Sequence, residues 1–193
     1  LGRRLAAKDP LGAVTTCTYS QRGDLLSVRD GVGGTTQYAY DGEHRLTQLT
    51  SPQGNVTSFT WGGYNRLAKK IDANGNVVQL GYDVEGNLTH VWNERRELHR
   101  LYYDSATRLI GEDTFDGRRL RYRNDLCFRP IRVVDERGRA TSFEYDEAGQ
   151  LTKRTGHTGT EEAFTYSALG HLVEANGPRS RVTFERDAFG KIL

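Results

Sequence analysis

Side chains able to do chemistry are scattered along this chain. The possible metal ligands and nucleophiles among its histidines and cysteines are His44, His90, His99, His157, His171, Cys17 and Cys127. None follows the spacing of a metal site, and no grouping of Ser, His and an acid stands out. We therefore predict no catalytic residue, no metal site and no cofactor. The two cysteines lie more than five repeats apart, so we expect both to be free thiols.

One stretch is unusually rich in positive charge. From Gly117 to Arg139 the sequence reads GRRLRYRNDLCFRPIRVVDERGR. Arg119, Arg121 and Arg123 alternate with apolar residues, so a strand here would place all three on one face. Such a stripe could bind phosphates, an acidic partner or an anionic surface. The alternative is a solvated polar face, partly neutralised by nearby Asp and Glu side chains.

An internal repeat positions these residues. The motif Y-D-x-x-G-x-L recurs at steps of 21 residues, as in YDVEGNL at 82–88 and YDEAGQL at 145–151. Its aromatic position is filled by Tyr19, Tyr40, Trp61, Tyr82, Tyr103, Tyr145 and Tyr166. Seven residues before the motif, a glycine position is filled by Gly12, Gly33, Gly54, Gly75, Gly117, Gly138 and Gly159. The fifth copy has Arg96 at the glycine position, and a ninth copy, RDAFGKI at 186–192, arrives one residue early.

Each copy holds two extended segments and two turns. Before the motif, Val78, Leu80 and Tyr82 alternate with Gln79 and Gly81, which is typical of a strand with one apolar face. The motif's Asp can bond its own backbone two residues on, and its Gly can adopt positive φ, so the motif predicts a turn. A second glycine turn, such as DANG or DERG, separates the copies. The sequence therefore predicts an all-β fold in which every copy is one β-hairpin.

The repeat also predicts the architecture. Nine copies over residues 1–193 give about 18 antiparallel strands of six or seven residues, in one long sheet that twist forces to curve. We expect the aromatic positions to bind copy to copy as a ladder on one face. Gly75 and Gly138 should need positive φ, and Arg96 suggests a different turn in its copy. The array is cut within a repeat at both ends, so we read it as an internal piece of a longer protein. About 18 strands are too few to enclose a 100-residue domain, so we predict an open, curved strip with two unpaired edges.

This pattern resembles the Rhs or YD repeat over essentially the whole chain. The sixth copy, NDLCFRP at 124–130, departs from the motif, and the third has Trp61-Gly62 in place of Tyr-Asp. In that family, long arrays wind into a hollow β-cocoon, as in bacterial polymorphic toxins, insecticidal toxin complexes and animal teneurins. The family's self-cleaving shell plug is not in this sequence. The resemblance therefore implies a segment of a larger YD-repeat shell and transfers no catalytic residue.

The resemblance implies a structural function, the enclosure of a C-terminal toxin or effector domain. The protein would be made in the bacterial cytoplasm and exported, for example by type VI secretion. Its implied partners are the rest of its own polypeptide shell, the enclosed toxin domain and secretion machinery, while edge strands are open to pairing with another copy. With a mean hydropathy of −0.68 and a net charge of +2, we expect neither membrane insertion nor a nucleic-acid partner. The alternative is a cell-surface binding module that recognises glycans or a partner protein; an enzyme is not expected.

Overall fold

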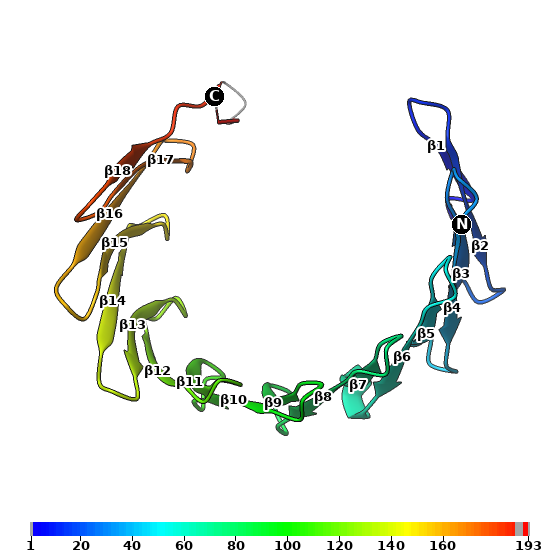
Figure 1. The fold of residues 1–193 in the computed structure, drawn as a ribbon, viewed down its shortest axis with the longest axis horizontal. Helices are drawn as coiled ribbons and strands as arrows, with labels where there is room; N and C mark the ends of the chain where they lie inside the picture. Colours follow the sequence, from blue (N-terminus) through cyan, green and yellow to red (C-terminus); the bar gives the residue numbers. More distant parts are fainter. Residues whose placement is uncertain (1, 188–190, 193) are drawn as a thin grey trace. The chain divides into compact units, whose positions relative to one another are not determined.

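The computed structural model describes residues 2–187 and 191–192, which form 18 β-strands joined by tight turns (Figure 1). The one helical element in these residues is a short 3₁₀ turn, Gly63–Asn65. No helix in this part of the chain is long and apolar enough to cross a membrane. The all-β fold predicted from the repeat is confirmed.

The chain divides into two units, residues 1–98 and 99–193. Unit 1 contains β1 (Ala6–Lys8), β2 (Val14–Tyr19), β3 (Leu25–Arg29), β4 (Thr35–Tyr40), β5 (Leu46–Thr50), β6 (Val56–Trp61), β7 (Leu67–Ile71), β8 (Val77–Tyr82) and β9 (Leu88–Trp92). Unit 2 begins within β10 (Leu98–Tyr103) and continues through β11 (Leu109–Asp113), β12 (Arg119–Asn124), β13 (Pro130–Asp135), β14 (Ala140–Tyr145), β15 (Leu151–Thr155), β16 (Glu161–Tyr166), β17 (Leu172–Asn176) and β18 (Arg181–Thr183). Within each unit, consecutive strands pair antiparallel in chain order.

Two kinds of strand alternate in both units. The even-numbered strands from β2 to β16 have six residues and end at the motif's aromatic position, whereas most odd-numbered strands have five and begin at its leucine position. Several strands are thus shorter than the six or seven residues predicted. A β-bulge follows each leucine position: Tyr82 pairs with Leu88 and Gly81 with His90, which leaves Thr89 unpaired. Such bulges increase the local twist of a strand pair.

The two turns of a copy have the same backbone. In the motif turn at Asp104, the Asp104 N–H donates to Arg108 O and the Thr107 N–H donates to Asp104 O, both at 3.0 Å. In the turn between copies, Asp72 N–H donates to Asn76 O and Gly75 N–H to Asp72 O, again at 3.0 Å. The Asp side chain completes the turn, since Asp104 Oδ1 accepts from the N–H groups two and four residues on. The backbone N–H of Arg108 is the main cause that lowers the pKa of the Asp104 carboxyl below its usual 3.8.

Positive φ recurs at the fourth residue of these turns whatever residue stands there. All seven glycine positions have it, with φ of 80° at Gly75 and 75° at Gly138. Arg96 has φ 62° and its N–H donates to Asn93 O at 2.9 Å, so it forms the same turn as its glycine counterparts. Our expectation of a different turn at Arg96 is wrong, because the hydrogen bonds of the turn are strong enough to hold a non-glycine residue in this conformation.

Two turns do differ from the rest. In the third copy, Tyr64 and Asn65 both have positive φ, within the 3₁₀ turn that follows Trp61-Gly62. The turn before the ninth copy is one residue shorter, because Gly177 N–H donates to Ser180 O instead of to a residue four positions on. This shorter turn explains why the ninth copy arrives early. The motif turn of that copy includes residues 188–190, which lie outside the described residues.

The side chain at the aromatic position ties most copies to the preceding one. The Tyr82 hydroxyl donates to Leu67 O, 15 residues earlier, at 3.0 Å. The same bond is made by Tyr19 to Arg4, Trp61 to Leu46, Tyr145 to Pro130 and Tyr166 to Leu151, at 2.7–3.2 Å. Asn124 makes it to Leu109 at 2.8 Å without any ring. What the position supplies is therefore a donor that reaches this carbonyl.

The bond matters because the backbone ladder between copies is short. β7 and β8 share three residue pairs, Ile71 with Val77 through Lys69 with Gln79. The last residues of β8, up to Tyr82, pair with β9 and not with β7. The start of β7, including the Leu67 carbonyl, therefore has no backbone partner on β8, and the Tyr82 side chain spans the gap.

The sheet of each unit is one layer thick. Within the described residues no hydrophobic side chain is buried, and Gly111 is the one residue of the buried class. The chain exposes 13625 Å², against about 9,200 Å² for a compact monomer of its 21.7 kDa mass. Without a core, each hairpin depends on contacts with its neighbours.

Replacement of Tyr82 by Phe tests the bond between copies. The change removes the donor and keeps the ring, so we expect the free energy of unfolding to fall by about 0.5–1.5 kcal/mol in urea denaturation. Tyr40→Phe is the matched control, because the Tyr40 hydroxyl has no hydrogen-bond partner among the described residues and its loss should cost about 0.5 kcal/mol or less. Equal losses in both variants would contradict this role.

Replacement of Gly75 or Gly138 by Val tests the turn between copies. A β-carbon at either site would meet no atom within 4 Å, so the cost is that of positive φ alone. We expect a destabilisation of about 1–3 kcal/mol from chemical unfolding midpoints. Gly42→Val is the control, since Gly42 is equally open and lies outside the positive-φ region. If Gly75→Val and Gly42→Val unfold at the same midpoint, backbone strain does not limit this turn.

Candidate interaction surfaces

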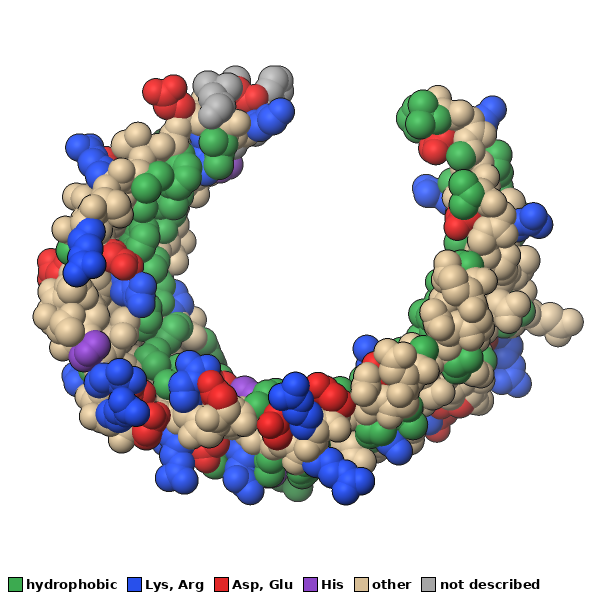
Figure 2. Space-filling view, in the orientation of Figure 1, with side chains coloured by type: hydrophobic (Ala, Val, Ile, Leu, Met, Phe, Trp, Pro, Cys, Tyr) green, Lys and Arg blue, Asp and Glu red, His purple; other side chains and the backbone are tan. Residues whose placement is uncertain are grey.

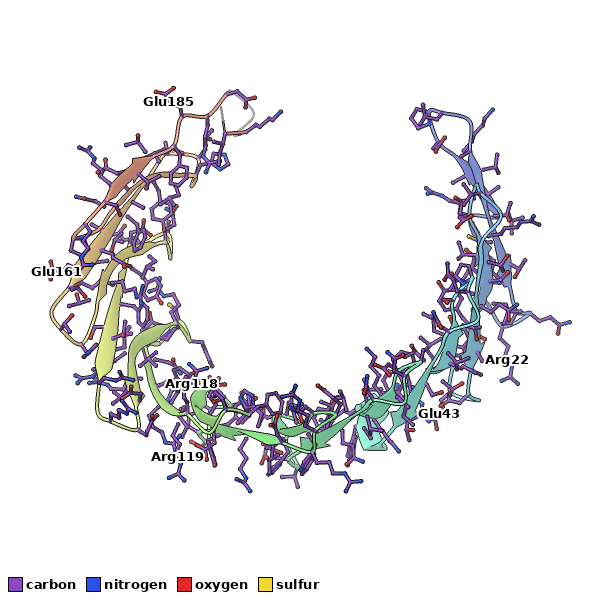
Figure 3. The ribbon with its side chains drawn as sticks, in the orientation of Figure 1. Arg22, Glu43, Arg118, Arg119, Glu161 and Glu185 are labelled. Carbon is purple, nitrogen blue, oxygen red and sulfur yellow. The ribbon has the colours of Figure 1, made fainter. Side chains whose placement is uncertain are left out.

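Unit 2 has one apolar face, here called the slot face because it carries the motif's aromatic positions. Phe143 and Tyr145 of β14 lie on it half-buried, while Ser142 and Glu144 are exposed on the opposite face. Arg119 also belongs to the opposite face, and Figure 3 shows it on the convex side of unit 2. The slot face is therefore the concave side, where Figure 2 shows a band of apolar side chains.

Charged side chains interrupt the slot face at two places: the Arg154–Glu162 ion pair at 3.0 Å between β15 and β16, and Glu112 of β11. Glu112 accepts a hydrogen bond from the Tyr122 hydroxyl at 2.5 Å, and its other oxygen lies 2.8 Å from His99 Nε2. The His99 ring also contacts Phe115 edge-on, with 5.2 Å between ring centroids. The His99 and Glu112 side chains are only 20% and 18% exposed. This cluster links β10, β11 and β12 through side chains, in addition to their backbone ladders.

Sequence reasoning missed this cluster. His99 follows no ligand spacing in the sequence, and the motif itself does not mark Glu112. The third residue after the leucine position is apolar in several copies, as at Val28, Leu49 and Val91, but it is Lys70 in β7 and Arg154 in β15. Glu112 is the one carboxylate at this position, which is a weak signal in the sequence. No group of three or more His, Cys, Asp or Glu side chains in the described residues is placed to hold a metal ion.

Only part of the predicted arginine stripe is free. Arg121 is bound, since its guanidinium lies 3.4 Å from Asp113 Oδ1 and 5.1 Å from the centre of the Tyr102 ring. The Arg121 side chain crosses β11 at Gly111 to reach Tyr102. Glycine is needed at this crossing, because a β-carbon at Gly111 would lie only 2.9 Å from Arg121 Cδ. Arg119 and Arg123 are exposed on the same face.

A different set of basic residues gathers at the turns that follow. Arg123 pairs directly with Arg132 on the neighbouring strand, and both are exposed on the face opposite the slots. Arg132, Arg137 and His157 line a polar groove of about 480 Å³ together with Ser142 and Thr155 hydroxyls. Within the same stretch, Arg129 and Arg139 form ion pairs with Asp125 and Asp135 at 2.7 and 2.6 Å. The alternative of a polar face neutralised by acidic side chains therefore holds for Arg129 and Arg139, and not for the whole arginine-rich stretch.

The predicted aromatic and glycine positions of the repeat lie within the strand and turn framework. The aromatic positions lie at strand ends and the glycine positions in turns, so the structure does not gather either set into one pocket. Cys17 and Cys127 are both free thiols, as expected.

Comparison with known proteins identifies relatives of these repeats. Residues 19–56, 40–77 and 129–162 match the RHS repeat family. A stretch of 94 residues, 48% of this chain and 7% of the relative, is 31% identical to double-stranded DNA deaminase toxin A of Burkholderia cenocepacia (strain H111).

Solved structures share the fold. A crystal structure of TcdB2-TccC3 matches with a TM-score of 0.65 and 18% identity, over 91% of this chain and 13% of that one. The Photorhabdus luminescens Tc holotoxin pore matches with a TM-score of 0.65 and 12% identity, over 99% and 13%. The chain therefore spans about an eighth of the solved chains that it resembles, and at these identities the likeness concerns the fold alone.

The alkaline stability of the protein tests the Glu112 cluster. Burial first, and then the hydrogen bond to Glu112, raise the pKa of the Tyr122 phenol above its usual 10.0. Folding thus favours the protonated phenol, so this stabilisation is complete below about pH 10 and is lost as the pH rises further. In urea denaturation at stepped pH, Tyr122→Phe should lose less stability than the parent between about pH 10 and 12.

The matched control for this titration is Tyr64→Phe, at a side chain that is 89% exposed. It should follow the parent curve. Burial also raises the pKa of Tyr40 and Tyr145, so Tyr122→Phe should make the alkaline decline shallower without abolishing it. Identical declines in the parent and in Tyr122→Phe would contradict the burial of this phenol.

Proposed function

This chain belongs to the RHS repeat family, and we propose that it forms a wall segment of a shell that encloses a toxin or effector domain. In this proposal the segment acts by steric enclosure and has no chemistry of its own. Its partners are the rest of the shell and the enclosed domain.

The single observation that carries the proposal is the uncovered slot face. Stable domains normally bury the apolar face of a sheet against a second layer. In unit 2 the apolar face is concave and half-buried, and the described residues supply no second layer to cover it. This is the arrangement expected of a shell wall. The apolar concave face would face the enclosed volume, and the arginine-rich opposite face would face solvent.

Size supports the view that further wall is needed. Nine strands per unit at about 4.8 Å span roughly 43 Å of sheet. A folded domain of 100 residues is about 30 Å across, so its circumference alone is roughly 90 Å. Neither unit by itself could surround such a domain.

The names of the relatives favour a toxin as the enclosed domain. One relative is a double-stranded DNA deaminase toxin, and one solved structure with this fold is part of a Tc holotoxin pore. We extend this to the present chain as an effector that is made in the bacterial cytoplasm and exported.

Limited proteolysis of the complete polypeptide that contains these repeats tests the enclosure. We expect a domain joined to the repeats to resist protease as long as the repeats stay folded. Unfolding of the repeats in denaturant is monitored by tryptophan fluorescence. Once they unfold, the joined domain should be digested at the same rate as that domain expressed alone. The 193-residue chain mixed with the same domain should give no protection. Digestion of the joined domain under native conditions, at the rate of the isolated domain, would rule enclosure out.

A further inference from the structure

The sixth copy departs from the others at neighbouring positions on one edge of unit 2. Asn124 stands at its aromatic position and Pro130 at its leucine position. The turn between them carries Leu126 and Phe128, which are 91% and 60% exposed. This turn therefore exposes two large apolar side chains, whereas the turns with Val84 and Leu169 each expose one.

The missing ring is accompanied by a pocket. Asn124 keeps the hydrogen bond of its position, from Nδ2 to Leu109 O. Beside it lies a pocket of about 310 Å³, whose walls include Tyr103, Leu109, Tyr122, Phe128 and Pro130. An apolar cavity of about 150 Å³ is enough to take up benzene in other proteins, so one aromatic ring fits this space.

Phe128 occupies the positive-φ position of its turn, with φ 66°, as His44 and Thr107 do in equivalent turns with φ of 63° and 60°. Positive φ is therefore a property of the turn, and what differs in this copy is the large apolar side chain that stands there. The Phe128 side chain provides one wall of the pocket.

We propose that this pocket binds the ring of a tyrosine side chain from another polypeptide segment. The chain's own repeat defines the ligand, because a tyrosine or tryptophan ring stands at the position of Asn124 in the seven preceding and following copies from Tyr19 to Tyr166. Asn124 Oδ1 has no hydrogen-bond partner in the described residues, so it can accept a hydrogen bond from a phenol hydroxyl. Phe128 lines the pocket and is 60% exposed, so its ring also offers apolar surface to the chain that flanks such a tyrosine. The proposal is independent of the enclosure of a toxin domain.

Binding of p-cresol, the side-chain analogue of tyrosine, tests the site on the 193-residue chain. By NMR we expect saturable shifts at Tyr103, Tyr122 and Phe128, and at least tenfold weaker binding of p-xylene, which lacks the hydroxyl. Asn124→Tyr should fill the pocket with its own ring and weaken p-cresol binding at least tenfold. Absence of saturable shifts in the parent, or full binding by Asn124→Tyr, would overturn the proposal.

A second variant separates binding from folding. Phe128→Gly relieves the backbone and removes one wall, so its urea midpoint should stay equal or rise while p-cresol binds at least fivefold more weakly. His44→Gly makes the same change at positive φ in unit 1, away from the pocket, and should bind p-cresol like an unchanged chain. If Phe128→Gly binds p-cresol as tightly as the parent, the pocket assignment is wrong.

A competition experiment tests the polypeptide source of the ring. A short peptide with one tyrosine between leucines should displace p-cresol, and the same peptide with alanine in place of tyrosine should not. Binding of p-cresol without displacement by the tyrosine peptide would contradict a polypeptide ligand.

Discussion

The architecture depends on one side-chain hydrogen bond that is repeated along the chain. A donor at the motif's first position reaches the carbonyl 15 residues earlier, as from Trp61 to Leu46 O at 2.7 Å. The backbone pairs between copies cover only half of each even-numbered strand, so this bond closes the half that they leave open. Tyr, Trp and Asn all serve in this position, because the requirement is a donor of sufficient reach rather than a particular ring.

Because the sheet has no buried core, the rest of the structure depends on local contacts within and between neighbouring hairpins. Most turns are held by backbone hydrogen bonds and a residue at positive φ, and many also by the side chain of their own Asp, while each strand is held by its neighbours. Such a sheet can be lengthened one hairpin at a time, and its surface is available because no second layer covers it. Function in this construction comes from which side chains the faces present, which is why Glu112 on the slot face and the uncovered pocket at Asn124 stand out.

Much of this could be read from the sequence, for local reasons. The period-2 alternation through Tyr82 predicted strands and their apolar face, and the regular glycines predicted where positive φ would fall. The bulge at Thr89 could not be predicted, because a one-residue shift in register leaves the composition unchanged. Residue type at Arg96 predicts the wrong turn, because the hydrogen bonds of the turn set the backbone conformation there. The Glu112 cluster and the Asn124 pocket depend on pairing across strands, which comparison of residue types alone does not provide.

Hydrogen exchange of the two tryptophan indoles tests the central bond most directly. Trp61 Nε1–H donates to Leu46 O, whereas the Trp92 indole N–H has no hydrogen-bond partner among the described residues and its ring stacks on His90 at 5.4 Å. The two indole N–H signals can be followed separately by NMR and assigned with Trp61→Phe. We predict that the Trp61 proton exchanges slowly and only as the repeats open, while the Trp92 proton exchanges rapidly from the folded state. Equal, rapid exchange of both protons would contradict the account.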